Sequence, residues 1–478
     1  MDRRRLALAL ATLSIGLPAA AATARKPDPA RKQAVVASVD RHRAELVALS
    51  DQVWGFAETA LRETRSAQVL ADYAQQQGFT VERGVAGLPT AFTATYGQGR
   101  PVIAVMGEYD ALPGLSQKAE PAREALVAGA PGHGCGHNLF GVASLGAALA
   151  IKEALADGRL KGTVRFYGTP AEEAVGGKVY MLRAGLFKDV DVALVWHPDT
   201  ENRADAVSNQ AIVDLAVEFH GRAAHAAYDP WNGRSALDAL ELFTHAVNLM
   251  REHVKPTVRL HYVVTDGGDV PNVVPEHARL WLWVRDVQRA GVQDVLARVR
   301  QAAAGAAQAT GTEARVTVQA GDYELLINQA GARLLHDNLA WLGPIAYTAE
   351  EEAFARALQK SAGVAEKGMD TRLQPLEGQE STGGSTDVGD VSWNVPTLHA
   401  SVATAPAGVP WHAWPVVAAG GMSIGHKRLV QAAKALAATL YDLYDRPAAR
   451  EAVQAEFREK TRGFTYEPFV PDGPPPLP

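Results

Sequence analysis

The chain has 478 residues, of which 47% are hydrophobic and 21% are charged, a composition typical of a globular protein with two or more domains. The formal net charge is −6. This acidic balance gives no electrostatic footprint for nucleic acid, so nucleic acid is excluded as the expected partner.

The N-terminus has the pattern of an export signal. Arginines at 3–5 precede a short apolar run over 6–17, and small residues suitable for cleavage follow at 20–24. We predict a signal peptide over 1–24, of the Sec or the twin-arginine type, and hence a periplasmic or secreted protein. The apolar run is too short to span a bilayer, so no membrane contact is expected after cleavage. The alternatives are an uncleaved anchor or a wrongly assigned start codon, and 25–32 is expected to be a linker.

Residues 33–208 alternate helix and strand signals and are predicted to be the first part of a catalytic domain. Continuous apolar runs are typical of strands buried on both faces. The expected elements are helices over 34–56 and 139–156 and strands over 101–106, 164–167 and 192–196. This order predicts an α/β fold in which helices cover a mainly parallel sheet.

Residues 209–325 differ in pattern and are predicted to form a small inserted domain. Apolar and polar residues alternate over 213–219 and 280–284, which indicates strands of an antiparallel sheet with one open face. Helical patterns follow these strands, over 235–253 and 292–299. The expected class of this insertion is α+β.

The catalytic domain is expected to resume over 326–446. A strand at 397–400 and a closing helix at 423–444 flank a loop over 377–390 that is rich in glycine, serine and threonine. Residues 447–478 are predicted to be a C-terminal tail, because the end of the chain has six prolines and no periodicity.

A cysteine between glycines and histidines is the strongest chemical signal in the chain. Residues 132–138 read Gly-His-Gly-Cys-Gly-His-Asn and include the only cysteine, Cys135, so an internal disulfide is excluded. Glycines let the backbone turn tightly, and Cys and His are ligands for borderline-soft metals. Cys135 is the predicted bridge between two cations, with His137 beside it and His133 as a less favoured ligand. The alternative is a buried structural cysteine.

Further candidates follow the predicted buried strands. Glu172 and Glu173 come after a turn, so that one carboxylate can bind metal while the other acts on water. His197 ends a strand, and ligands of open α/β sheets gather at strand ends. Asp110 follows another strand and is expected to orient a metal-bound imidazole. Glu108 is either a metal ligand or an acidic residue of a turn without a role at the site.

The last ligand is expected from the returning segment, where three histidines compete. His412 lies in Pro-Trp-His-Ala-Trp, and the residues alone do not rank it above His399 or His426. His225, in the inserted domain, is either a donor to a carbonyl oxygen or a loop histidine without a role.

Seven ordered motifs resemble the aminoacylase-type zinc or manganese metallopeptidases, in particular their cysteine-bearing branch. The motifs are GEYDALPG, GHGCGHN, GTPAEE, FHGRAAHAA, GGDVPNVVPE, GSTDVGD and PWHAWPVV, and the resemblance covers nearly all of 35–450. The family includes carboxypeptidases that cleave folate glutamate and plant hydrolases of indoleacetyl-amino acids. Other branches carry an Asp as the metal bridge and a His at the position of Glu108.

The resemblance implies a role for each candidate. The implied ligands of two divalent cations, zinc or manganese, are Cys135 as the bridge, His137, Glu173, His197 and His412. Glu172 is implied as the general base and Asp110 as the residue that orients the site. The inserted domain over 209–325 is implied as a lid and dimerisation domain, and His225 as its lid histidine that, in a homodimer, reaches into the neighbouring active site. Asn272 is implied as a lid contact to substrate.

The predicted activity is that of a metal-dependent amidohydrolase on N-acyl or N-aroyl amino acids, or on short peptides with a free carboxylate. Glu172 is expected to take a proton from water and pass it to the leaving amine. Arg285 is the chosen partner of the substrate carboxylate and Trp411 part of an aromatic wall. The alternatives considered for these contacts are Arg222, Arg234, Trp393 and Trp414.

Other functions remain open at this point. A dipeptidase or carboxypeptidase of the same family is the nearest alternative. A thiol hydrolase would use Cys135 with His133 or His137, and it requires a thiolate free of metal. An exported binder of metal or substrate would need no spare base at Glu172. Besides a second copy of this chain, a different subunit is an alternative partner.

Overall fold

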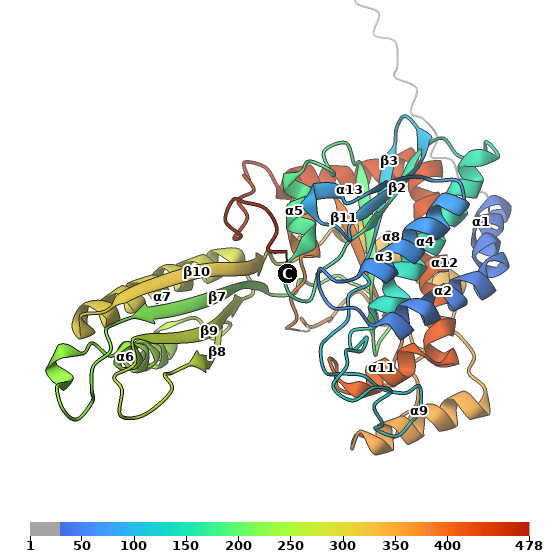
Figure 1. Cartoon of the computed structure of the whole chain (residues 1–478). Coiled ribbons are helices and arrows are strands. Elements are labelled where there is room, and N and C mark those ends of the chain that lie inside the picture. Colours follow the sequence, from blue (N-terminus) through green and yellow to red (C-terminus); the bar gives the residue numbers. More distant parts are fainter. Residues whose placement is uncertain (1–28, 382, 478) are drawn as a thin grey trace, which may run out of the picture.

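The computed structural model describes residues 29–381 and 383–477, which form a large unit and a small unit. The large unit contains a seven-stranded sheet and the small unit a four-stranded sheet. Figure 1 shows the small unit extending from one side of the large unit. The chain passes between them where β7 (Ala211–His220) begins and β10 (Glu313–Asp322) ends.

The central strands of the large sheet are parallel and buried. Its order is β1-β2-β4-β3-β5-β11-β6, in which β4, β3, β5 and β11 pair in parallel and the outer pairs are antiparallel. Every residue of β3 is buried, which explains its continuous apolar run. The strands are β1 (Thr80–Arg83), β2 (Phe92–Gln98), β3 (Val102–Gly107), β4 (Gly162–Gly168), β5 (Val192–Asp199), β6 (Arg203–Ala204) and β11 (Thr397–Ala403).

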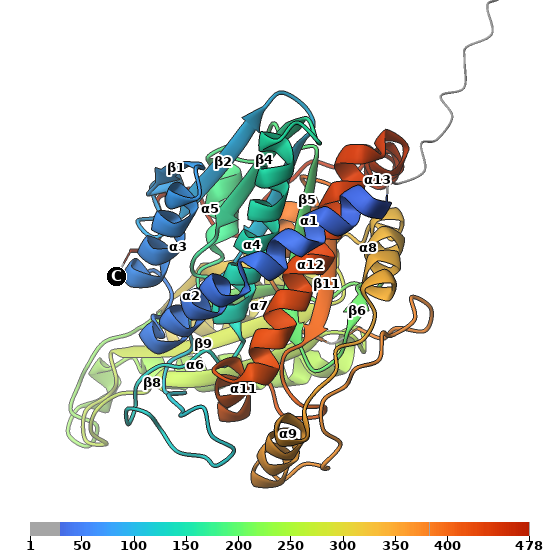
Figure 2. The ribbon, with the colours of Figure 1, turned by 90° about the vertical axis from the view of Figure 1, so that its right-hand side faces the viewer.

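Helices pack against this sheet in layers. Figure 2 shows α1 (Pro29–Arg41) and α2 (Arg43–Phe56) lying across α4 (His137–Ala156) and α12 (Ser423–Asp445), behind which the sheet lies. The other helices are α3 (Thr64–Gln76), α5 (Gly177–Arg183), α8 (Gln329–Leu342), α9 (Ala349–Ser361), α10 (Val388–Ser392), α11 (Trp414–Gly420) and α13 (Pro447–Lys460), with a 3₁₀ turn at η1 (Val85–Gly87).

Helix α4 forms the core of the large unit. All residues over 137–151 are buried. In the described part of the chain, this one helix is long and apolar enough to cross a membrane, and 78% of its apolar window is buried inside the protein. Such burial is also typical of a helix that is hydrophobic all round because it lies in the core of a globular domain.

The small unit is an antiparallel sheet covered by two helices. Its strand order is β10-β7-β9-β8, with β8 (Arg259–Asp266) at one edge and β9 (His277–Asp286) inside. Along β9, buried Leu280, Leu282 and Val284 alternate with residues on the other face. The buried face packs with α6 (Ala236–Met250) and α7 (Arg289–Thr310), and 3₁₀ turns lie at η2 (Pro230–Asn232) and η3 (Arg251–His253).

The end of the chain returns to the junction of the two units. The Tyr466 hydroxyl donates to Asp390 of the large unit at 2.6 Å. Arg289, at the start of α7 in the small unit, donates to the carbonyl oxygen of Glu467 at 2.7 Å. The C-terminal segment therefore bonds to both units.

The predicted fold class is confirmed: the protein is α/β, with a mainly parallel sheet and a separate antiparallel sheet. The proposed boundaries at 209 and 325 stay a prediction, and the predicted signal peptide lies outside the described residues. One expectation was wrong. The linker expected over 25–32 already includes the start of α1, because Pro29 suits the first turn of a helix. The tail over 447–478 stays a prediction as a division of the chain, and its first part forms α13, which starts at a proline and buries Val453.

Candidate metal centre and active site

The loop before α4 brings a thiol and an imidazole together at the end of the sheet. Gly136 has φ +77° and caps α4, and a Cβ on it would lie 2.9 Å from a carbon of Pro198. Only glycine combines that conformation with that approach. The turn places Cys135 and His137 on either side of Gly136, next to the end of β5.

Two groups of ligand atoms share the Cys135 sulfur. The first group is Cys135, His137 and His197, and the second is Cys135, Glu173 and His412; within each group the ligand atoms lie within 4.8 Å of one another. Cys135 Sγ is 3.4 Å from His197 Nε2, and His412 Nε2 is 3.5 Å from Glu173 Oε2. The structure thus brings together all five residues implied as ligands.

The donors fit a pair of divalent cations. The buried polar atoms of the described residues that form no hydrogen bond include His137 Nε2 and Glu173 Oε1, which is costly unless a further group binds them. Glu108 Oε2 lies 3.1 Å from His137 Nε2 as an ion-pair contact, but it forms no hydrogen bond with it. Sulfur, imidazole and carboxylate donors together suit zinc, while the carboxylate also admits manganese. A sulfur atom common to both groups is suited to bridging.

Asp110 fixes the orientation of both groups. Its Oδ1 is 2.9 Å from His137 Nδ1, and its Oδ2 accepts a 2.9 Å hydrogen bond from the backbone N–H of Glu173. Burial alone would raise the pKa of Asp110, but the hydrogen bond and charge of His137, the N–H of Glu173 and the charge of Lys178 together outweigh burial and lower it. A proton held on Nδ1 by Asp110 leaves His137 Nε2 free to bind a cation, as second partners of metal-binding histidines generally do.

Burial perturbs the acid–base properties of the ligands. Burial and the charge of Glu173 raise the pKa of the Cys135 thiol, so a thiolate requires a cation beside it. Burial and the nearby His137 lower the pKa of His197 well below its usual value, which favours the neutral imidazole that ligates metals. Burial raises the pKa of Glu173 to about 7.

Glu172 lies beside the ligands and lines the cavity. It follows Ala171, which has φ +61°, and the turn directs the two neighbouring glutamates differently. Its carboxylate forms a third close group with Glu108 and His137. Burial and the charge of Glu108 raise the pKa of Glu172 well above its usual value. A raised pKa suits a carboxylate that accepts and returns a proton near neutral pH.

Glu108 belongs to a buried ion-pair network that the sequence did not reveal. Lys178 is fully buried and donates from Nζ to Glu108 Oε1 at 2.6 Å and to Asp387 Oδ1 at 2.5 Å. Lys178 lies in α5, and no spacing in the sequence links it to Glu108 or Asp387. Glu108 Oε2 lies 3.1 Å from His137 Nε2, so this carboxylate borders the metal centre rather than being a plain turn acid.

The other histidines lie outside the two ligand groups. His399 lines the cavity but pairs with Asp205 at 2.5 Å, and His426 pairs with Asp51 at 2.8 Å. His133 bonds to the carbonyl oxygen of Val53 at 3.0 Å, and burial lowers its pKa to about 4.

A cavity of about 1080 Å³ opens from the metal centre to the small unit. Arg285 lines this cavity and donates to the Ser385 hydroxyl at 2.9 Å, with its guanidinium 5.1 Å from the Trp283 ring centroid. Arg222 and Arg234 bond instead to nearby backbone carbonyls and do not line it. The cavity therefore favours Arg285 among the three arginines.

Aromatic side chains line both ends of the cavity. Trp411 donates to Cys135 Sγ at 3.3 Å. Trp281 and Trp283 line the end formed by the small unit, on the same face of β9 as Arg285. Sequence reasoning overlooked these two as substrate contacts, although their period-two spacing with Arg285 carried the signal. Trp393 and Trp414 do not line the cavity.

His225 and Asn272 lie elsewhere on the small unit. Both are exposed, and the N–H of Ala226 donates to the Asn272 carbonyl oxygen at 3.0 Å. Neither lines the cavity. Within a single copy, the structure does not bring them to the metal centre.

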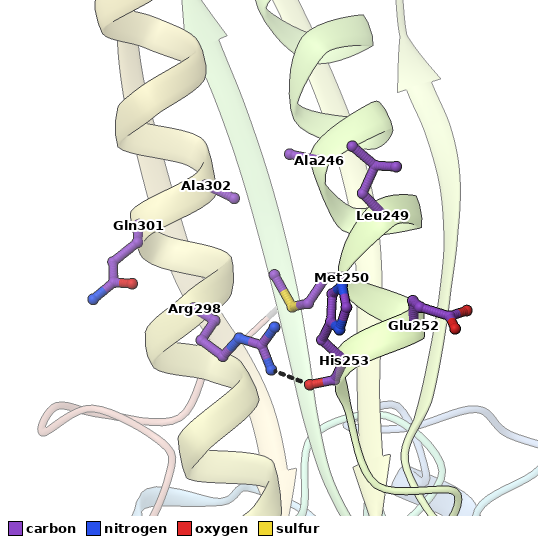
Figure 3. Close-up of a pocket in the computed structure, with 8 residues that line it drawn as sticks. All are labelled: Ala246, Leu249, Met250, Glu252, His253, Arg298, Gln301 and Ala302. Atoms are coloured by element: carbon purple, nitrogen blue, oxygen red, sulfur yellow. Dashed lines mark hydrogen bonds between the residues drawn. The ribbon is translucent and has the colours of Figure 1, made fainter.

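A second hollow lies between α6 and α7 (Figure 3). It is lined by Ala246, Leu249, Met250, Glu252, His253, Arg298, Gln301 and Ala302, and Arg298 bonds to the carbonyl oxygen of His253 at 2.8 Å. It contains none of the candidate site residues.

Comparisons with known proteins agree with this geometry. The model of peptidase family M20/M25/M40 matches residues 104–438. One of the subunits of p-aminobenzoyl-glutamate hydrolase from Escherichia coli (strain K12) is 36% identical over 474 residues, covering 92% of this chain and 98% of that protein. The Xaa-Arg dipeptidase of Mus musculus is 30% identical over 442 residues, covering 90% and 92%.

Solved structures show the same fold. The aminobenzoyl-glutamate utilization protein of Klebsiella pneumoniae aligns with a TM-score of 0.58 and 19% identity, covering 87% of this chain and 97% of that chain. A dinuclear metal-binding peptidase of family M20 from Bacillus subtilis aligns with a TM-score of 0.58 and 18% identity, covering 85% and 99%.

Proposed function

The chain belongs to peptidase family M20/M25/M40, and from this premise we propose that it is a two-metal amidohydrolase of N-acyl or N-aroyl amino acids. The substrate class is an amide with a free carboxylate, such as p-aminobenzoyl-glutamate. The observation that carries the proposal is the pair of ligand groups sharing Cys135, with Glu172 beside them in one cavity.

The residues that would hold the cations are Cys135, His137 and His197 on one side and Cys135, Glu173 and His412 on the other. Two divalent ions, zinc or manganese, would activate water and polarise the amide carbonyl there. Asp110 keeps His137 and the backbone of Glu173 in place.

Glu172 is the proposed general base. It takes a proton from the attacking water and delivers it to the amine that leaves. Burial and the charge of Glu108 raise its pKa, and the neighbouring Glu173 is engaged at the ligand group.

Arg285 is the proposed partner of the substrate carboxylate. Its guanidinium is partly buried, faces the cavity and has a neutral hydroxyl, Ser385, as its hydrogen-bond partner. A carboxylate would supply the charge-assisted bonds that arginine favours. Trp283 and Trp411 offer flat apolar surfaces to an aromatic acyl group.

His225 is proposed to act across a homodimer. It is exposed and outside the cavity of its own chain, so a second copy would supply it as a donor to the carbonyl oxygen. Exposed apolar residues on the small unit, Leu242, Leu249, Val263 and Val264, support a contact surface there. Two different subunits of the Escherichia coli p-aminobenzoyl-glutamate hydrolase are relatives of this chain. This similarity supports a partner subunit as the alternative to a homodimer.

Asn272 is proposed as a substrate contact. The N-terminal pattern supports export of the protein.

A dipeptidase is the second candidate function. It is favoured by the 30% identical relative named Xaa-Arg dipeptidase and by the carboxylates Asp199, Asp205, Asp214 and Glu380, which line the cavity. A thiol hydrolase is disfavoured, because burial raises the pKa of Cys135 and leaves no free thiolate.

The test pairs metal content with turnover of N-aroyl glutamates and Xaa-Arg dipeptides, with and without chelator. We expect about two divalent ions per chain and hydrolysis that chelator abolishes and zinc or manganese restores. Glu172→Gln should retain the ions and lose about 10²–10⁴-fold in kcat. Chelator-indifferent activity, or wild-type turnover by Glu172→Gln, would reject the proposal.

A further inference from the structure

A buried carboxyl group behind the active site holds the loop that carries the glutamate pair. Glu63, directly before α3, has 0% exposure. Its Oε1 accepts a hydrogen bond of 2.9 Å from the backbone N–H of Ala171, and its Oε2 accepts one of 2.9 Å from the Thr90 hydroxyl. No step of the proposed reaction uses Glu63.

The residue that Glu63 bonds has an unfavourable backbone conformation. Ala171 has φ +61°, in the left-handed region where its Cβ is crowded by its own backbone. Ala171 is also fully buried, so its N–H must find a partner inside the protein. Without Glu63 the turn would lose both that partner and the contact that favours this φ.

The two residues that follow Ala171 are the proposed base and a proposed ligand. The N–H of Glu173 is itself bonded to Asp110 at 2.9 Å. Glu172 therefore lies between two backbone amides that are each fixed by a buried carboxyl group. Its direction depends on the turn at Ala171.

We propose that Glu63 is a positioning residue, which holds Ala171 in the left-handed conformation and thereby aims Glu172 into the cavity. The inference rests on the proposed role of Glu172 as general base. Glu63 acts through the backbone and touches neither substrate nor ligand group.

The charge state of Glu63 agrees with this role. Burial and the nearby charge of Asp110 raise its pKa to about 8. A neutral acid retains the carbonyl oxygen that accepts from Ala171 and adds no repulsion towards Asp110. Glutamine has the same shape and the same acceptor, so it is the conservative replacement.

The test compares Glu63→Gln, which keeps an acceptor for Ala171, with Glu63→Leu, which fills a similar volume without one. We expect Glu63→Gln to keep kcat within about twofold, and Glu63→Leu to lose about 10–100-fold in kcat, because a small misplacement of a catalytic group costs up to about 100-fold. KM and the metal content of Glu63→Leu should stay near wild type. In its crystal structure Ala171 should leave the left-handed region.

A rescue separates positioning from general stability. Glycine adopts φ > 0 without strain, so Ala171→Gly added to Glu63→Leu should recover most of the lost kcat. Glu58 provides the matched control, because its carboxylate caps the same helix at Arg65 and Ser66 but does not bond the glutamate loop. Glu58→Leu should lower Tm and leave kcat unchanged. If Glu63→Leu does not fold, Glu63→Asp, whose shorter side chain cannot reach Ala171, replaces it.

Wild-type kcat in Glu63→Leu, or equal losses in the Leu and Gln variants without rescue by glycine, would overturn the inference. Glu172→Gln is measured in parallel. If Glu172→Gln is inactive while Glu63→Leu is fully active, the positioning role alone fails. If Glu172→Gln is fully active, the proposed function fails.

Discussion

The candidate residues of the large unit and of the small unit differ in burial. In the large unit, His137 is buried and held by Asp110, and the backbone of Glu173 is bonded to the same carboxylate. In the small unit, His225 and Asn272 are exposed, although the backbone N–H groups of Ala227 and Tyr228 donate to His225 Nδ1. Both imidazoles are therefore oriented in advance, but only that of the large unit is already shielded from water, and His225 would be shielded on assembly or closure. Substitutions in the large unit and in the small unit should therefore differ in the size of their effects.

Removal of the shared sulfur should have the largest effect. Cys135→Ala deletes an atom common to both ligand groups, so we expect both ions to be lost together and activity to fall to background. The loss of metal affinity should exceed the ~10–100-fold that follows removal of a ligand's outer partner. Metal analysis after dialysis measures this. Retention of one ion with full affinity would show that the two groups are independent.

His225→Ala should lower kcat by about 10²–10³-fold, which is the usual effect of removing one hydrogen-bond donor to the oxyanion. The stronger test mixes the His225→Ala protein with the Glu172→Gln protein, each of which is nearly inactive by itself. In a homodimer that exchanges His225, one site of each mixed dimer is complete, so an equimolar mixture should recover up to about a quarter of wild-type activity. No recovery after verified subunit exchange would contradict action across a dimer.

Arg285→Ala should raise KM by about 10–100-fold for substrates with a free carboxylate, the worth of a hydrogen bond to a charged group. The corresponding amide-capped substrates should be affected little. Arg222→Ala is the matched control, since its guanidinium bonds to the Asn232 carbonyl oxygen away from the cavity. Equal effects of the two replacements would remove Arg285 from the substrate site.

The smallest effect is expected on stability. Burial opposes ionisation of Asp205, but His399 and Arg203 outweigh it and lower its pKa. A lowered folded-state pKa stabilises the protein above the ordinary value near 3.8, and this stability is lost as pH falls through the lower folded value. Asp205→Asn should therefore cost ~1.5–3 kcal/mol in the free energy of unfolding at pH 7, and less below pH 4.

Asp266 in the small unit is the comparison for Asp205. It pairs with His277 at 2.6 Å, but its side chain is 42% exposed. Solvent-exposed pairs contribute ~0–1 kcal/mol, so Asp266→Asn should change the free energy of unfolding little. Chemical denaturation at several pH values measures both variants. Equal losses of stability in the two variants would contradict the expected difference between a buried and an exposed carboxylate.

Sequence patterns predicted the elements better than the groups that restrain them. The apolar run at β3 and the alternation along β9 follow from burial on two faces or one, so both were predictable. The ligand candidates also carried signals, since they follow buried strands or glycine turns. Spacing alone did not separate His412 from His399 and His426; the family resemblance favoured His412, and the distances agree with it.

The restraining groups had no local signal. Glu63 bonds to Ala171 across 108 positions, and Lys178 bonds to Asp387 across 209. Such pairs depend on which segments the sheet brings together, and a single sequence does not encode that as a spacing. The helix over 447–460 was missed because the prolines that follow it dominated the composition.

The C-terminal segment has a consequence for the movement of the two units. Tyr466 bonds to the large unit, and its neighbour Glu467 accepts a hydrogen bond from the small unit. Because two adjacent residues are each bonded to a different unit, a hinge rotation of one unit against the other would have to break at least one of these hydrogen bonds. The segment therefore acts as a brake on changes in the shape of the cavity between the units.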